Sequence, residues 1–354
     1  MDKKELIAVP QRKINNYLFN ASLLCIILAY DNLKPWFYEN YLQIYFNPKK
    51  SDIYSNQGWL DFYGGWTLPQ QVLEYKEFER NYFENVYIID FIESCIEQGN
   101  YIFTYIDEYY IDNAMYFGKH FVHDTFIYGY DRKKQQISVI AYDNNSNFSK
   151  YTISYSSFES AFSAAMKTTE NKESWNEKYC VLYKCKYDNN YEYKFNLKKF
   201  LENLSDYLYS VNTALKDKPD YQLYLSKDNI FGINVYDGVL NHLNGIEKGS
   251  QLFYPSIHTL YEHKLALKER LQYISNNFGI SDNFSELVDK TDILIEAFDT
   301  FRLLAIKYNA LHKENLIEKM CSIIEEQKGF EKELLSNVCD AINNYIIQLK
   351  YNEK

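Results

Sequence analysis

The spacing of hydrophobic and polar positions changes along the chain and divides it into two regions. In the first region short apolar runs alternate with polar turns, which is typical of mixed helices and strands. After Pro255 glycine and proline nearly vanish, and apolar residues such as Leu260 and Leu267 recur at helical spacing. The pattern predicts an α+β domain over residues 1–250, with an antiparallel sheet, and an α-helical bundle over residues 251–354.

The clearest β-pattern lies in residues 118–155. The runs "HDTFIYGYD", "ISVIAYD" and "FSKYTISY" are separated by polar turns and predict three antiparallel strands in a meander. Upstream, the apolar run Ala21–Tyr30 predicts a buried helix, with Asn20 as its N-cap and Ala21 at its first helical position.

Charge and composition narrow the classes of partner. The net charge is −10 and no long basic run is present, which argues against a nucleic-acid partner. The apolar run Ala21–Tyr30 is shorter than the ~20 residues that span a bilayer, and no signal-peptide cleavage site follows it. We therefore expect a cytoplasmic protein without a membrane partner. The cysteines have no framework spacing and are expected to be free thiols: Cys25, Cys95, Cys180, Cys185, Cys321 and Cys339.

The stretch "HFVHDTFIYGYD" carries two of the chain's six histidines, His120 and His123. A zinc site would need two more ligands at recognisable spacing, and nothing ties Cys180 or Cys185 to these histidines. We expect neither a metal nor another cofactor. A second interpretation is structural, with both histidines at the entry of a strand.

A third interpretation of the stretch is catalytic. If His123 begins one strand of a hairpin, Asp143 ends the other strand, and the hairpin brings the two side chains together. A carboxylate beside an imidazole fixes the tautomer of the ring and stabilises the imidazolium. His120 is offset by an odd number of residues and is expected on the opposite face of an extended segment.

The segment "HDTFIYGYD…ISVIAYD" resembles the His–Asp segment of papain-like cysteine enzymes. It is most similar to the bacteriocin-processing double-glycine peptidases and to the butirosin-biosynthesis H-type N-terminal domain, which the longer run "YIDEYYIDNAMYFGKHFVHDTFIYGYD" resembles more specifically. The resemblance implies a papain-like core over about residues 15–190. It also implies that His123 is the general base, that Asp143 orients it, and that a cysteine carries the acyl group as a thioester.

The resemblance places the nucleophilic cysteine at the amino end of the first apolar helix, where the helix dipole favours a thiolate. The matching positions here are Leu18 or Phe19, and neither is a nucleophile. Cys25 is the only cysteine of this helix, but a small buried residue of core type is the alternative for it. Ser22 lies nearer the helix start, and Ala21 could mark a lost nucleophile.

Two classes of function follow from these residues. The first is an acyltransferase of secondary-metabolite (peptide or polyketide) biosynthesis. It would move an acyl group from a carrier-protein thioester to an amine through Cys25, His123 and Asp143, with Gln11 as an oxyanion donor. The second is a catalytically inactive papain-like binding or scaffold protein of such a pathway. The missing nucleophile favours this second class, whereas the His123–Asp143 pair favours the enzyme, because a buried polar pair without a function costs stability. A cysteine peptidase or amide hydrolase is a further alternative within the first class.

Overall fold

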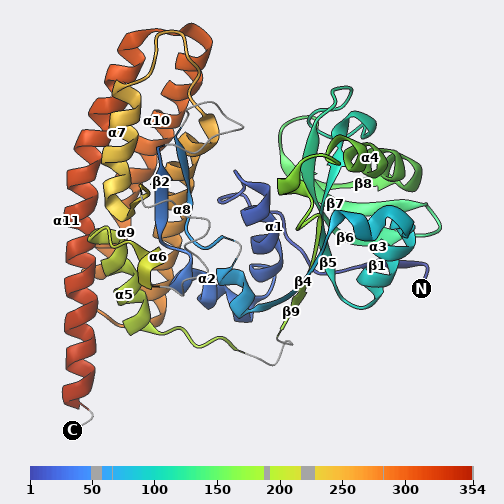
Figure 1. The fold of residues 1–354 in the computed structure, drawn as a ribbon. Coiled ribbons are helices and arrows are strands. Elements are labelled where there is room, and N and C mark those ends of the chain that lie inside the picture. The colour runs from blue at the N-terminus through green and yellow to red at the C-terminus, as the bar shows by residue number, and fades with distance from the viewer. Residues whose placement is uncertain (49–57, 66, 187–191, 217–227, 282, 353–354) are drawn as a thin grey trace. The chain divides into compact units, whose positions relative to one another are not determined.

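The fold of the chain is mixed α+β, with an antiparallel sheet region followed by long C-terminal helices (Figure 1). It is seen in a computed structural model that describes residues 1–48, 58–65, 67–186, 192–216, 228–281 and 283–352. The α+β class predicted from the sequence is confirmed. The chain forms two compact units, unit 1 with residues 1–34 and 65–192, and unit 2 with residues 35–64 and 193–354.

Unit 1 is built on a seven-stranded sheet in which every registered strand pair is antiparallel. The strand order is β4-β9-β5-β6-β7-β8, and β1 pairs with the far end of β6. The meander predicted over residues 118–155 is confirmed as β6, β7 and β8. The strands are β1 (Lys3–Glu5), β4 (Leu73–Phe78), β5 (Tyr101–Asp107), β6 (Val122–Asp131), β7 (Gln136–Tyr142), β8 (Phe148–Ser154) and β9 (Cys180–Cys185).

Helices cover this sheet on two sides, and Figure 1 shows α1 and α3 on opposite sides of it. Ile106 and Ile127 belong to the apolar cluster that contains α3 and α4. Phe126 points to the other face, where it stacks on Tyr101 at 5.7 Å, and the Tyr101 hydroxyl donates to the Ile7 carbonyl at 2.5 Å. The helices of unit 1 are α1 (Leu18–Ile27), α3 (Ile88–Glu97) and α4 (Tyr155–Thr168), with 3₁₀ turns η1 (Asp31–Leu33), η2 (Leu68–Gln71), η3 (Arg80–Asn85), η4 (Glu108–Tyr110) and η5 (Glu173–Trp175).

The helix α1 begins earlier than the sequence pattern predicts. It begins at Leu18 rather than at Ala21, with Tyr17 as its N-cap and no side-chain cap. Asn20, predicted as the cap, is a buried residue inside the helix. Since nearly every residue of α1 is buried, packing decides where the helix starts, and a capping side chain does not. The expected packing of this helix on the sheet is confirmed, because α1 contacts β6.

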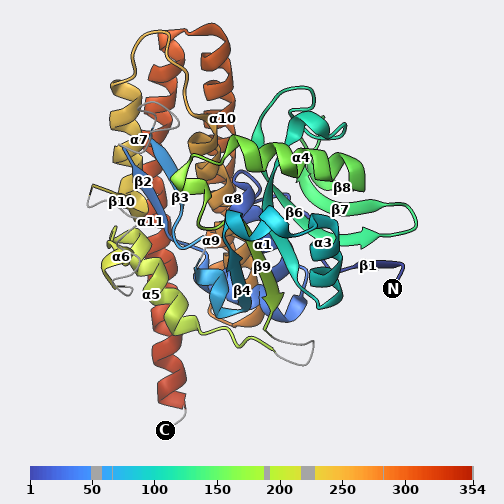
Figure 2. The same cartoon turned by 45° about the vertical axis from the view of Figure 1, so that its right-hand side comes forward.

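Unit 2 joins a small sheet to the long helices. The run from Pro35 was expected to be helical, but the helix ends at Asn40 and residues Ile44–Asn47 form a strand. That strand, β2, pairs with β3 and β10, and β3 is tied to α8 because the Leu60 N–H donates to Ser256 Oγ at 3.0 Å (Figure 2). Its elements before α8 are α2 (Lys34–Asn40), β2 (Ile44–Asn47), β3 (Trp59–Phe62), α5 (Leu197–Leu208), α6 (Thr213–Lys216), β10 (Ile230–Phe231), η7 (Gly232–Asn234) and α7 (Val235–Asn244).

The C-terminal part of unit 2 is helical, as the sequence predicts. Its described residues from Tyr254 onward form helices and their short connections: α8 (Tyr254–Asn277), α9 (Phe284–Asp289), α10 (Thr291–Leu311) and α11 (Glu314–Asn352). The predicted division at residue 250 differs from the contact pattern, in which 35–64 and 193–250 group with these helices.

An ion pair lies inside the helices of unit 2. Lys264 Nζ on α8 is 2.7 Å from Glu331 Oε1 on α11, and both side chains are 0% exposed. The hydroxyls of Tyr207 and Tyr236 donate to the same carboxylate, and His263 Nδ1 lies 3.0 Å from Lys264 Nζ. The carboxylate and the ammonium group are therefore surrounded by polar partners, which offsets part of the cost of burying both charges.

Gly232, where η7 begins, provides a test of this packing. Its φ is +58°, and a Cβ there would lie 2.2 Å from the Tyr207 carbonyl oxygen. We expect Gly232→Ala to lower the free energy of unfolding by about 3 kcal/mol, measured by urea denaturation, because a backbone clash adds to the left-handed conformation. Gly249→Ala is the control: φ is +85° there, and beyond its two chain neighbours no described residue has a heavy atom within 4 Å of the added Cβ, so a loss of about 1 kcal/mol is expected. Equal losses in the two variants would contradict the clash.

Candidate acid–base site

The candidate site lies where β5 ends and β6 begins. β5 ends at Asp107, whose side chain accepts a hydrogen bond from the Tyr109 N–H at 3.2 Å and so caps η4. Glu108 follows at the start of that turn. The antiparallel register places Ile106 opposite His123, so the two carboxylates lie alongside the segment that carries both histidines. Both carboxylates are only 2% exposed.

The first pair of the site is His123 with Glu108. Nδ1 of His123 is 2.5 Å from Glu108 Oε1, so the ring donates a hydrogen bond to the carboxylate. The other carboxylate oxygen, Oε2, accepts the Tyr116 N–H at 2.9 Å, which holds Glu108 in place. The His123 side chain is 23% exposed, and no described residue forms a hydrogen bond with its Nε2. This is the arrangement of an oriented general base.

The charges around His123 favour its protonated form. Burial lowers the pKa of His123, but the hydrogen bond to Glu108 and the negative charges of Asp124 and Glu108 outweigh burial, so the pKa is raised above the ordinary histidine value. Burial also raises the pKa of Asp124 to about 6, partly opposed by His123 and reinforced by Glu108. The pKa values of His123 and Asp124 are thus both raised, and perturbed pKa values of neighbouring groups are typical of acid–base sites.

The second pair is His120 with Asp107. Nδ1 of His120 is 2.8 Å from Asp107 Oδ2, and Oδ1 of the same carboxylate accepts the Phe121 N–H at 3.1 Å. His120 is 66% exposed and its ring stacks on Tyr109 with centroids 4.2 Å apart. The two histidines therefore bond different carboxylates, and His120 is the more exposed of the two.

Large apolar side chains are exposed around the two pairs. The Phe121 ring lies 5.3 Å from the His123 ring, and Tyr116 packs against Phe121 at 4.3 Å. The exposed apolar side chains of this segment are Tyr109, Met115, Phe117 and Phe121. Apolar surface beside oriented polar groups is typical of a binding site.

The predicted partner of His123 is wrong, because Asp143 bonds its own turn. Its Oδ1 accepts the N–H groups of Asn145 and Asn147 at 2.9 Å each, and its Oδ2 accepts the Ser149 hydroxyl at 2.9 Å. Burial would raise the pKa of Asp143, but these hydrogen bonds outweigh it and the pKa is lowered. Asp143 also forms a β-bridge with Ala114, which lies in the segment before β6. That segment therefore lies beside the end of β7, where His123 was expected.

The orientation predicted for His123 is also wrong. Paired residues of an antiparallel sheet share a face, and Ile106, opposite His123, belongs to the cluster with α3 and α4. The helix α1 lies on the other side of the sheet (Figure 1). On that other side Asp124 is paired with Tyr105, and the Tyr142 hydroxyl donates to the Asn15 carbonyl just before α1. His123 therefore points away from the helix that was expected to carry the nucleophile.

Cys25, the predicted nucleophile, and Gln11, the predicted oxyanion donor, lie close to each other. The contacts described for them involve neither histidine pair. Cys25 is fully buried inside α1, and burial raises the pKa of its thiol to about 12. At neutral pH this thiol is protonated and is a poor nucleophile. The Gln11 side-chain amide donates to the carbonyls of Val9 at 2.8 Å and Leu24 at 3.3 Å, which occupies the donors an oxyanion would need.

The sequence pattern did not indicate Glu108, yet Glu108 is the carboxylate that orients His123.

Three further findings concern metal binding, membrane-spanning helices and similarity to known proteins. Within the described parts of the chain, His, Cys, Asp and Glu side chains form no group of three or more that could hold a metal ion. No helix in those parts is both long and apolar enough to cross a membrane. No protein-family model matches the chain, and no curated protein is significantly similar to it.

Proposed function

We propose that this chain is a cytoplasmic, acyltransferase-like protein of peptide or polyketide secondary metabolism, with a papain-like fold, that uses His123 as a general base without a cysteine intermediate. The observation that carries the proposal is the pair of His123 Nδ1 and Glu108 Oε1, 2.5 Å apart, with the carboxylate buried and the ring partly exposed. The proposed partners are an acyl carrier protein or carrier-bound thioester and an amine acceptor.

The proposed reaction is a direct transfer. The acceptor nitrogen attacks the thioester carbonyl carbon, and His123 Nε2 takes the proton that the nitrogen loses. When the tetrahedral intermediate collapses, the C–S bond breaks and the imidazolium gives this proton to the leaving thiolate. The products are an amide and a free carrier thiol. Glu108 stabilises the imidazolium through Nδ1, and the exposed side chains of Phe121 and Met115 would contact the acyl chain.

A second candidate is the inactive binding or scaffold protein of the same kind of pathway. The burial of the Cys25 thiol favours it, because the covalent route of papain-like enzymes needs an accessible thiolate. The same observation weighs against a cysteine peptidase or amide hydrolase. The two main candidates agree that no acyl group is held on a cysteine and differ on whether the bound thioester reacts.

Direct transfer implies that no covalent acyl intermediate forms on the protein. Incubation with an acyl-N-acetylcysteamine thioester should give no acyl adduct on the protein in intact-mass spectra, while the amide product accumulates when an amine is present. Cys25→Ala should leave the transfer rate unchanged, since this thiol stays protonated at neutral pH. An adduct on Cys25 that hydroxylamine removes would contradict direct transfer. Binding of the thioester without amide formation would favour the scaffold protein.

A further inference from the structure

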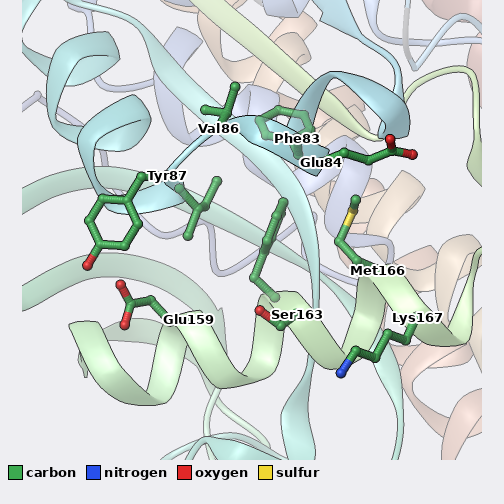
Figure 3. Close-up of a pocket in the computed structure, with 10 residues that line it drawn as sticks. Phe83, Glu84, Val86, Tyr87, Glu159, Ser163, Met166 and Lys167 are labelled. Atoms are coloured by element: carbon green, nitrogen blue, oxygen red, sulfur yellow. The ribbon is translucent and has the colours of Figure 1, made fainter.

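A pocket separate from the two histidine pairs lies between the η3–α3 segment and α4 in unit 1 (Figure 3). Its volume is about 480 Å³, within the range of small-molecule sites. Its apolar lining includes Phe83, Val86, Phe162 and Met166. Phe83 and Phe162 are buried and in ring contact at 5.5 Å, so the floor of the pocket belongs to the core of unit 1. An apolar body would therefore meet preformed apolar contacts there.

One carboxylate of the pocket has unused hydrogen-bonding capacity. Oε1 of Glu159 on α4 is buried and has no hydrogen-bond partner among the described residues. Figure 3 shows the Glu159 carboxylate and the Tyr87 ring on the same side of the pocket. The nearby Glu159 carboxylate is the largest influence on the Tyr87 phenol and raises its pKa, so the two groups lie close together. A buried carboxylate oxygen without a donor is costly, and a ligand that donates a hydrogen bond would relieve that cost.

We propose that this pocket binds a small primary amine that carries an aromatic or branched aliphatic body, with its ammonium group donating to Glu159 Oε1. The ammonium group supplies the missing donor and the opposite charge, and the apolar body covers Phe83, Phe162 and Met166. The inference does not depend on the acyl-transfer proposal, because no residue of the pocket belongs to the histidine pairs.

The other charged groups of the pocket define the selectivity. Figure 3 shows the Glu84 carboxylate pointing away from Glu159, and Lys167 two turns further along α4. Glu159 is thus the anion that a bound ammonium group meets, and Lys167 is a matched position for a control on the same helix. An isosteric acid in place of the amine would face the Glu159 carboxylate and be excluded by like-charge repulsion.

The experiment uses the full chain with 2-phenylethylamine as the probe and 3-phenylpropionate as the anionic comparison, both followed by isothermal titration calorimetry. We expect the amine to bind and the acid not to bind. Glu159→Gln should weaken amine binding about tenfold or more, since a charge-assisted hydrogen bond is lost. Ser163→Trp should abolish binding by filling the pocket, and Lys167→Gln should leave it unchanged or slightly stronger. Thermal unfolding of each variant checks that it is folded.

Equal binding of amine and acid, or amine binding that Glu159→Gln leaves unchanged, means that Glu159 does not recognise an ammonium group. Amine binding that survives Ser163→Trp in a folded variant places the amine elsewhere on the chain. No detectable amine binding at millimolar concentration also rejects the proposal.

Discussion

His123→Ala is expected to reduce thioester-to-amine acyl transfer by about 100-fold or more, because an oriented general base typically contributes that much to the rate. The measurement is kcat/KM for an acyl-N-acetylcysteamine donor and a primary amine acceptor. His120→Ala is the matched control: it removes the same type of side chain from the neighbouring pair, whose ring is more exposed, and is expected to lower kcat/KM by less than about fivefold. Equal losses in both variants would contradict the role of His123.

The pH profile separates a base from a structural histidine. The transfer needs neutral His123, whose pKa is raised, so the acid limb of kcat/KM should have its midpoint above the ordinary histidine value. Glu108→Gln removes the charge and the strongest hydrogen-bond acceptor but leaves the burial that lowers the pKa, so the limb should move to lower pH while the plateau rate falls. An unmoved limb would mean that Glu108 does not tune the base.

Glu331→Ala is expected to lower the free energy of unfolding by about 3–5 kcal/mol, the second large effect. The change leaves the Lys264 ammonium group fully buried without its 2.7 Å partner, and the hydroxyls of Tyr207 and Tyr236 lose their acceptor. Urea denaturation followed by circular dichroism measures the loss. Removing both charges, as in Lys264→Met with Glu331→Leu, should restore much of it, because no unpaired charge then remains inside the bundle.

A control for the buried pair lies one turn along α8. Lys268 is bonded to Asp292 at 2.5 Å, but these side chains are 24% and 50% exposed, so solvent screens their attraction. Lys268→Ala should therefore cost at most about 1 kcal/mol. If Glu331→Ala cost no more than Lys268→Ala, burial would not be what makes the Lys264–Glu331 pair strong.

The elements that the sequence predicted well are those with local patterns. The strands of the meander are short β-branched and aromatic runs bounded by polar turns, and α8 and α10 repeat apolar residues at helical spacing, so their own residues specify them. The three-stranded sheet of unit 2 was not predicted because β10 pairs with β2 from about half the chain length away, and no local pattern reveals such a pairing. The start of α1 was misplaced because burial, and not the polar Asn20, decides it.

The candidate site was predicted in part for a related reason. The choice of His123 rested on its place at the start of a strand, and the structure does pair it with a carboxylate. The partner was wrong because hairpin spacing says nothing about the segment Asn113–Met115, which bonds to the end of β7 and so lies beside Asp143. The sequence did contain a second candidate partner for His123. Glu108 directly follows β5, which pairs with β6 on the side opposite to β7.

The division of the chain into two units has a consequence for the order of events during synthesis. All of unit 1 has been translated once residue 192 is added, so unit 1 can fold while residues 193–354 are still being synthesised. Residues 35–64 are made early, yet β2 and β3 belong with helices that are translated last. This aromatic segment therefore remains without its final partners until residues 193–354 have been made.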